Sequence, residues 1–248
     1  MANSEILILS DGKPGHFHQS LGLALNLVER SQGSTINTFT MNAAPSMAGR
    51  ISAFCGSPER ILRQCFDDAE SLMFQARRCK ILIETGSSTA WAAIAIGRLF
   101  PHLKKLHILQ PPFYRPFCEV LLPEHDSLWM NRPNVMRFLV GLGTVNQASI
   151  ALHAGEVSLK LLRSPAGAEK GVALLIGGNS RSYRMTVEKV LPFASAFVSA
   201  GMEVLMTTSR RTPPDVGNAL KQMATHPAFC LAVFVDEQPY NPLPGMLA

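Results

Sequence analysis

Apolar and polar positions at the start of the chain form a short apolar run, a polar turn and a helix-like pattern. Residues 6–9 are all aliphatic, which is typical of a strand buried on both faces of a parallel sheet. Residues 10–15 hold two glycines and a proline and therefore predict a turn. From His16 onward, apolar residues recur at helical spacing. We interpret this stretch as the first strand–loop–helix unit of an α/β domain, in which ligands bind at the loop that follows the strand.

The same succession of patterns continues to about residue 140. Apolar runs predict further strands, and amphipathic patterns predict helices. The strands are expected at residues 35–41, 80–84, 105–110, 119–122 and 135–140, and the helices at 58–77 and 90–100. Small residues dominate segment 43–58 and prolines interrupt segment 111–116, so both are expected to be irregular. Strands that alternate with helices predict a parallel sheet.

A second series of strands and helices begins after residue 145. It predicts helices at 146–162, 185–200 and 214–224, and strands at 172–176, 203–206 and 230–235. We therefore predict an α/β protein with two Rossmann-like domains, residues 1–145 and 146–248. The second domain has about three strands, fewer than the roughly five to six of an average sheet. It is expected to be incomplete, either truncated or completed by another chain.

Composition excludes several classes of protein. A net charge of +5 and an isoelectric point near 9.1 fit an anionic ligand or an anionic membrane surface. There is no long run of like charges, so a nucleic-acid-binding tail is not expected. The five cysteines contain no C-x-x-C pair, which argues against zinc and a disulfide framework and favours a reducing cytoplasm. No apolar stretch approaches the ~20 residues of a membrane span, and the N-terminus does not read as a secretory signal.

The polar turn after the first strand is the first candidate site. Asp11 and His16 could supply a general base, and Lys13 a cation. Alternatively, Asp11 is a turn residue and His16 only begins the helix. Glu124 and His125, at another strand end, form a second acid/base candidate, with a solvated loop as the alternative. We expect no metal site.

Two loops in the second domain are candidates for binding phosphate. Gly177, Gly178, Asn179 and Ser180 follow a strand and precede a helix, so their backbone amides and the helix N-terminus could face a phosphate, with Arg184 nearby. The alternative is a tight turn that merely needs glycine, and the two possibilities are equally weighted. The loop matches neither the dinucleotide-binding fingerprint nor the P-loop.

The second of these loops follows the next strand and carries Thr208, Ser209, Arg210 and Arg211. Hydroxyl and guanidinium groups at this density can bind a diphosphate through charge-assisted hydrogen bonds. The alternative is a helix N-cap at Ser209 or Thr212, with Pro213 at the first helical position. Two such loops side by side favour anion binding. The absence of a Gly-x-Ser-x-Gly elbow argues against a serine hydrolase.

Four short blocks together resemble the glycosyltransferase family that is named after a plant mitochondrial-fission protein and is widespread in bacteria. They are residues 10–16 with Gln19, residues 123–126, residues 175–178 and residues 208–213. The resemblance covers nearly the whole chain. It implies a GT-B-like fold, in which the first domain binds mostly the acceptor and the second mostly the nucleotide sugar. The family pattern continues beyond residues 241–248 with a block expected to face the donor, which this chain lacks.

The resemblance implies a glycosyltransferase that moves a sugar from a nucleotide diphosphate sugar to a cell-envelope acceptor, with no cofactor and no metal. Asp11 or His16 would be catalytic. The acceptor side would include Lys13, Gln19, Glu124 and His125, and the donor side Gly177, Gly178, Asn179, Ser180, Arg184, Thr208, Ser209 and Arg210.

Two other functions fit the same sequence: a non-catalytic adaptor that retains the fold, which the short second domain favours, and a nucleotide-sugar epimerase. The expected location is the cytoplasm, with peripheral association at the inner face of the membrane. The expected partners are a nucleotide sugar, an unidentified acceptor and an oligomeric copy that completes the second domain, and nucleic acid is not among them.

Overall fold

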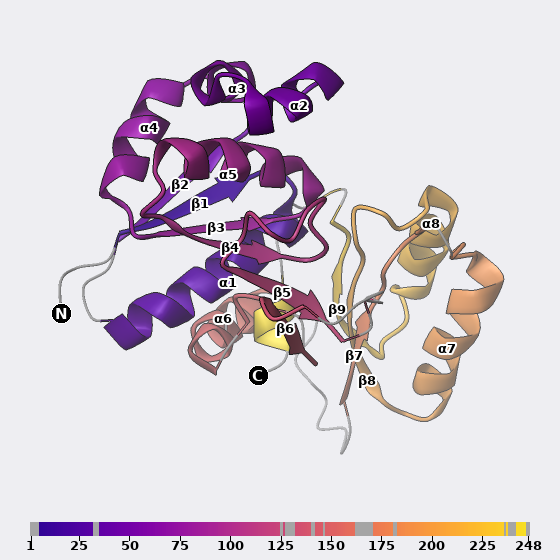
Figure 1. Ribbon diagram of the computed structural model, residues 1–248. Coiled ribbons are helices and arrows are strands. Elements are labelled where there is room, and N and C mark those ends of the chain that lie inside the picture. Colours follow the sequence, from indigo (N-terminus) through magenta and orange to yellow (C-terminus); the bar gives the residue numbers. More distant parts are fainter. Residues whose placement is uncertain are drawn as a thin grey trace. The chain divides into compact units, whose positions relative to one another are not determined.

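The chain folds into two compact units, Met1–Thr144 and Val145–Ala248. The computed structural model describes residues 5–31, 35–124, 126, 132–139, 142–145, 147–161, 171–180, 183–235, 237 and 242–246. Each unit contains a parallel sheet with helices packed against it (Figure 1). The predicted α/β class with two Rossmann-like units is confirmed. Among the described helices, none is both long and apolar enough to cross a bilayer.

Unit 1 is built on a six-stranded sheet in the order β2-β1-β3-β4-β5-β6, in which all pairs are parallel. The strands are β1 (Ile6–Ser10), β2 (Ile36–Thr40), β3 (Ile81–Thr85), β4 (Lys104–Ile108), β5 (Glu119–Pro123) and β6 (Val135–Phe138). The position of β1 inside the sheet, between β2 and β3, explains its continuous apolar run, because alternate side chains enter the cores on the two faces of the sheet. Ile6 and Ile8 pack on one side, and Leu7 and Leu9 on the other.

Helices cover both faces of this sheet (Figure 1). They are α1 (Pro14–Ser31), α2 (Met47–Cys55), α3 (Pro58–Cys65), α4 (Ala69–Arg78) and α5 (Ser87–Leu99). The α1 face buries Ala24 against Ile6 and Ile8. The opposite face buries α3, α4 and α5 in a larger core, in which a run of alanines lets α5 lie close to the strands.

Helix α2 corrects the prediction of irregular structure for residues 43–58. The segment contains Pro45, Gly49 and Gly56, which disfavour a helix. Three contacts outweigh this preference. The Ser46 hydroxyl accepts the Gly49 amide (3.2 Å), Ala53 is fully buried, and Arg98 from α5 donates to the carbonyls of Ala53 and Gly56 (both 3.0 Å).

The single helix predicted for residues 58–77 is two helices. Phe66 ends α3 in an extended conformation, and its side chain stays in the core. Asp68 then begins α4 by accepting the Ser71 amide (3.0 Å). Periodicity alone missed the break because Phe66 and Ala69 continue the apolar pattern across it.

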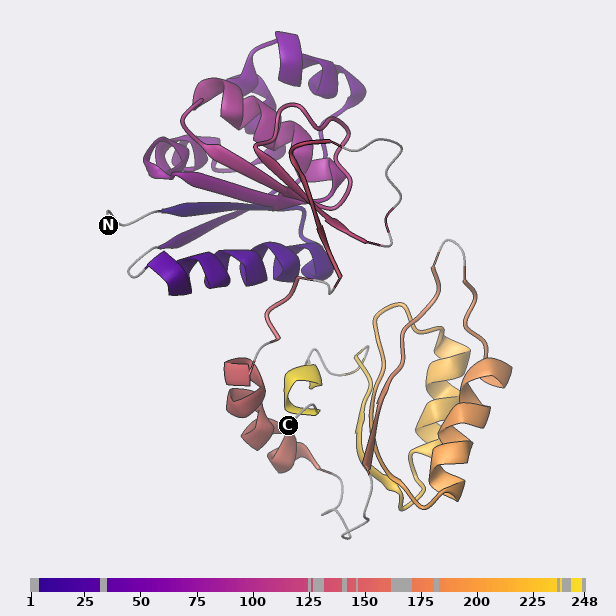
Figure 2. The ribbon, with the colours of Figure 1, turned by 60° about the horizontal axis from the view of Figure 1, so that its bottom comes forward.

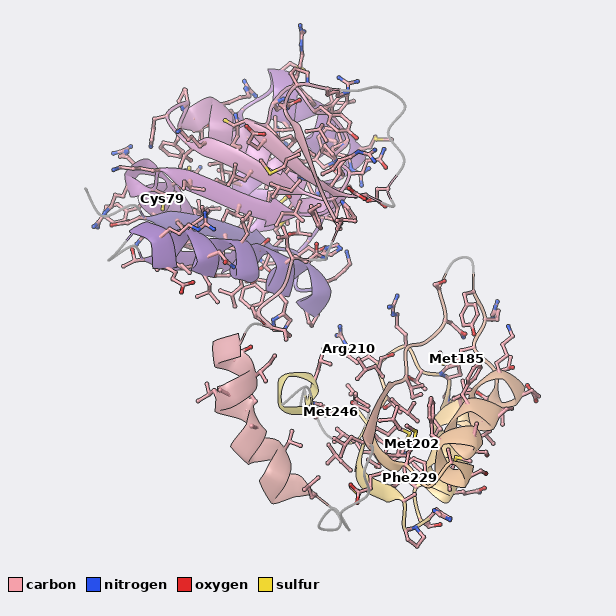
Figure 3. All side chains as sticks on the ribbon, turned by 90° about the horizontal axis from the view of Figure 1, so that it is seen from below. Cys79, Met185, Met202, Arg210, Phe229 and Met246 are labelled. Carbon is pink, nitrogen blue, oxygen red and sulfur yellow. The ribbon has the colours of Figure 1, made fainter. Side chains whose placement is uncertain are left out.

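Unit 2 contains a three-stranded parallel sheet in the order β7-β8-β9. Its strands are β7 (Gly171–Leu175), β8 (Glu203–Thr207) and β9 (Phe229–Val233), and its helices are α6 (Gln147–Lys160), α7 (Val187–Ser199), α8 (Pro214–Met223) and α9 (Leu243–Met246). Helices α7 and α8 cover one face, and α6 and α9 lie on the other (Figure 2). Met246 of the unpredicted helix α9 packs with Val157, Leu231 and Val233 (Figure 3).

Candidate functional site

The loop between β1 and α1 brings Asp11, Lys13 and His16 together. Asp11 Oδ2 accepts hydrogen bonds from the Lys13 ammonium (2.6 Å) and from His16 Nδ1 (3.0 Å). Asp11 Oδ1 accepts the Lys13 backbone amide (3.2 Å). The Asp11 side chain is only 6% exposed, and that of His16 is 26% exposed. The carboxylate is thus held inside the loop, while the imidazole remains accessible to solvent.

The charge state of Asp11 follows from these contacts. Partial burial favours the neutral acid, but the hydrogen bonds from Lys13 and the nearby positive charge outweigh it and lower the pKa of the Asp11 carboxyl below its usual value. Asp11 is therefore ionised at neutral pH and holds a proton on His16 Nδ1. Among the described residues, no hydrogen bond uses the other ring nitrogen, Nε2, so it can accept a proton from a ligand.

Gly86 supports the imidazole from the neighbouring strand, a link to His16 that the sequence did not predict. Strand β3 lies beside β1, so its carboxyl end meets the opening loop. A Cβ on Gly86 would lie 2.7 Å from His16 Cε1, and the residue has φ +89°, a conformation that favours glycine. Nearby, the Ser20 and Thr85 hydroxyls are hydrogen-bonded to each other at 2.7 Å. The signal in the sequence was the Gly-Ser-Ser turn that follows a buried strand.

Two other acceptor-side candidates stand apart from this constellation. Gln19 is half-buried on α1, one turn after His16. Glu124 is exposed at the end of β5, which is separated from β1 by β3 and β4. At the usual strand spacing, that places it about 14 Å from the opening loop. His125 lies outside the described residues.

A buried polar cluster beneath the site was also missed by sequence reasoning. The Glu84 carboxylate is hydrogen-bonded to His107 Nδ1 on one side and to the Thr89 hydroxyl on the other, and all three residues are fully buried. Thr89 Oγ1 also lies 3.1 Å from the carbonyls of Thr85 and Gly86, so the cluster supports the turn that holds His16. His107 Nε2 has no hydrogen-bond partner among the described residues. The available signal was a polar residue within each of two apolar strands.

In unit 2, the loops after β7 and β8 are joined to each other. The Thr212 hydroxyl donates to the Gly177 carbonyl (2.6 Å) and accepts the Ser209 amide (2.9 Å), and the Asn179 amide donates to the Arg211 carbonyl (3.1 Å). The predicted N-cap at Ser209 or Thr212 is wrong. Helix α8 has Pro213 at its N-cap, because the Thr212 hydroxyl bridges to the neighbouring loop instead.

The backbone of the β7 loop is only partly available to a phosphate. The Asn179 amide is used by Arg211, and the Ser180 amide donates to the Tyr183 carbonyl (2.9 Å). Helix α7 begins at Val187, so its N-terminus is several residues away from the glycines. Within the described part of the chain, the Gly177 and Gly178 amides make no hydrogen bond.

The side chains of the two loops divide into internal and exposed groups. The Thr208 hydroxyl accepts the Val235 amide (3.1 Å), and the Ser209 hydroxyl accepts the Arg211 amide (3.3 Å). The guanidinium groups of Arg184, Arg210 and Arg211 are exposed, and no carboxylate of the described residues forms an ion pair with them. Arg210 projects from the loop after β8 (Figure 3). Three cations beside two joined loops can attract an anion.

Gly178 is required by the close approach of these loops. A Cβ on Gly178 would lie 1.9 Å from the Arg211 carbonyl oxygen, so Gly178→Ala must push the loops apart. We expect it to lower the free energy of unfolding by about 1–3 kcal/mol, the usual cost of overpacking. Thermal unfolding followed by circular dichroism measures this loss. Gly177→Ala is the matched control, since its Cβ would meet only Met185 Cε at 4.0 Å. Equal stability of the two variants would contradict the tight contact.

Among the described residues, there is no cluster of three His, Cys, Asp or Glu side chains that could coordinate an ion.

Comparison with known proteins gave one family and several distant structures. The family model described as Mitochondrial fission ELM1 matches residues 14–248. No curated protein sequence matches the chain.

Three solved structures are similar over most of this chain. Escherichia coli ADP-heptose lps heptosyltransferase II is 11% identical over 98% of this chain and 75% of its own, with a TM-score of 0.47. Neisseria meningitidis UDP-GlcNAc 2-epimerase bound to UDP-GlcNAc is 12% identical over 97% and 74%, with a TM-score of 0.47. Medicago truncatula UGT71G1 complexed with UDP-glucose is 13% identical over 94% and 71%, with a TM-score of 0.42.

Proposed function

Because the chain belongs to the mitochondrial fission ELM1 family, we propose that it is a glycosyltransferase that moves a sugar from a nucleotide diphosphate sugar to a cell-envelope acceptor. The observation that carries the proposal is the pair of joined loops after β7 and β8, beside which three arginines stand without a carboxylate partner among the described residues. A leaving diphosphate needs such compensation of charge when no metal supplies it.

The donor diphosphate is assigned to unit 2. Arg210, Arg211 and Arg184 supply the positive charge, and the Gly177 and Gly178 amides supply hydrogen bonds. Thr208 and Ser209 act differently, because their hydroxyls are used inside the loops and hold the backbone in place. The bond between Thr212 and Gly177 keeps the two loops together while the ligand binds.

The acceptor is assigned to unit 1, with His16 as the general base. The free Nε2 takes the proton from the acceptor hydroxyl as its oxygen attacks the anomeric carbon and the nucleoside diphosphate leaves. Asp11 holds the imidazole in the required tautomer and stabilises the imidazolium that forms. Lys13 pairs with the same carboxylate. Its side chain is exposed to solvent and adds positive charge for an anionic acceptor. Gln19 and Glu124 are assigned to acceptor contacts farther from the reacting hydroxyl.

A donor-binding test separates this proposal from an adaptor function. Thermal unfolding of the full chain is measured with a panel of UDP-, GDP- and ADP-sugars, and the best ligand is then titrated. Arg210→Ala should raise its Kd about tenfold or more, since a hydrogen bond to a charged group contributes about 1.5–3 kcal/mol. Lys221→Ala is the control, because this cation of the same unit already pairs with Glu237 at 2.6 Å. Stabilisation by no nucleotide sugar, or equal binding by both variants, would contradict the donor site.

A further inference from the structure

A second hollow on unit 1 lies outside the Asp11–His16 constellation and is lined almost wholly by apolar side chains. Its volume is about 280 Å³. We call it, with its rim, the α2 surface, and it consists of Met47, Arg50, Ile51, Phe54, Cys55, Trp91 and Phe113. Neither the donor site nor the base assigned above uses any of these residues.

Three aromatic rings line the hollow of the α2 surface. Phe54, Trp91 and Phe113 pack edge-on in a triangle, with ring centroids 5.0–5.9 Å apart. Met47 and Ile51 continue the same face of α2, and their exposed fractions are 74% and 62%. Residues at i, i+4 and i+7 share one side of a helix. A contiguous apolar face of this kind on a folded unit indicates an interaction site.

The topology places this surface at the ligand-binding edge of the sheet. Helix α2 comes after the carboxyl end of β2, Trp91 lies in α5 after β3, and Phe113 follows β4. These ends lie at the same edge as the end of β1, where Asp11 stands. The segment with Phe113 leaves β4 through Leu109, whose φ of +73° is costly for a leucine, so the packing around it must hold this turn.

The segments that form the α2 surface carry charge of one sign only. Segments 43–56, 86–99 and 109–118 contain three arginines and no aspartate or glutamate. Arg50 lies over the Trp91 ring with its Cζ 5.9 Å from the centroid. Arg115 is exposed beside Phe113, and Arg98 is held by backbone carbonyls at the end of α2. Exposed apolar side chains beside Arg50 and Arg115, in segments that contain no carboxylate, suit an anionic lipid surface better than a protein partner with mixed charge.

We propose that the α2 surface docks on an anionic phospholipid bilayer. Met47, Ile51, Phe54 and Phe113 enter the boundary between head groups and acyl chains, and Arg50 and Arg115 meet the lipid phosphates. Docking in this way sets the loop with His16 close to the lipid head groups. The proposal is independent of the transferase activity, since it concerns only where unit 1 binds.

Flotation of the full chain with vesicles tests this surface. Phosphatidylcholine vesicles with and without phosphatidylglycerol are compared, and binding is expected only where the anionic lipid is present. Phe54→Ser/Phe113→Ser should lower the partition coefficient about tenfold or more, because two aromatic side chains that enter the bilayer are lost. Arg50→Gln should lower it about fivefold, the effect of one cation near a charged surface. Raised salt should weaken binding of the wild-type chain.

Two further variants keep the result interpretable. Met47→Ser/Ile51→Ser changes only highly exposed side chains, so it should fold normally and also lose vesicle binding. Phe74→Ser removes an exposed phenylalanine of α4, outside the α2 surface, and should bind like the wild type. Circular dichroism confirms that each variant is folded.

Several outcomes would overturn the proposal. One is the absence of wild-type binding to anionic vesicles, and another is unchanged binding by both double variants, Phe54→Ser/Phe113→Ser and Met47→Ser/Ile51→Ser. Binding to a monomeric lysolipid without vesicle binding would make the hollow a pocket for a single lipid molecule. Concentration-dependent dimers that the Phe54→Ser/Phe113→Ser variant loses, again without vesicle binding, would make it an interface between copies of the chain.

Discussion

His16→Ala is expected to lower the rate of sugar transfer by about 10²–10⁴-fold, the range that a positioned general base contributes. The reason is the contact of His16 Nδ1 with Asp11 Oδ2 at 3.0 Å, which leaves Nε2 to take the proton from the acceptor. Donor binding should be unchanged, because the donor is assigned to unit 2. The measurement is release of nucleoside diphosphate from the sugar donor that stabilises the chain most.

Two variants define the role of His16 more sharply. Asp11→Asn should cost a similar factor, because an amide that donates to Nδ1 moves the ring proton to Nε2 and removes the base. His18→Ala is the matched control, since His18 is exposed on the same helix and its Nδ1 lies 3.3 Å from the Thr144 hydroxyl instead of near Asp11. If His16→Ala keeps more than about a tenth of the wild-type rate, His16 is not the base.

The pH profile separates the two members of the pair. The pKa of Asp11 lies below its usual value, so Asp11 stays ionised throughout the range of about pH 5–7 in which histidines titrate. A fall in rate as the pH decreases through this range is therefore not caused by protonation of Asp11. The same limb should disappear in His16→Ala and remain in His18→Ala.

Glu84→Ala is expected to give the largest loss of stability, about 3–5 kcal/mol in the free energy of unfolding of unit 1. It leaves His107 and Thr89 in the core without the carboxylate that joins them. Both groups are fully buried, so water cannot replace the lost hydrogen bonds. Urea denaturation followed by circular dichroism measures the change.

Comparison with other variants tests whether the loss comes from an unpartnered buried group. Glu84→Leu/His107→Leu removes both partners and should be more stable than Glu84→Ala, because an apolar pair leaves no orphaned imidazole. Glu70→Ala breaks an exposed ion pair with Arg63 and should cost no more than about 1 kcal/mol. A loss in Glu84→Ala as small as that in Glu70→Ala would show that the buried cluster does not stabilise the unit.

The two predicted sites illustrate how far local sequence reasoning reaches. Asp11, Lys13 and His16 lie within six positions, and a tight turn must bring them together. The loops with Gly178 and Arg211 lie over 30 residues apart, yet parallel strands place their carboxyl ends at one edge. Sequence patterns do not show which backbone amides of these loops are hydrogen-bonded within the protein. The amides of Asn179 and Ser180 are paired within the protein, which only the structure reveals.

The sequence by itself determined the strands and the loops that follow them. A run such as residues 6–9 has no polar face, so it must be buried on both sides of a sheet, and the polar turn after it must reach solvent. Tertiary structure decided the rest, because the deciding contacts join residues far apart in the chain. Arg98 stabilises a helix of poor intrinsic propensity at α2, Glu84 finds His107 on the next strand, and the missing side chain of Gly86 leaves room for the His16 ring. Such pairs leave no periodic signal, since each depends on how two separate elements pack.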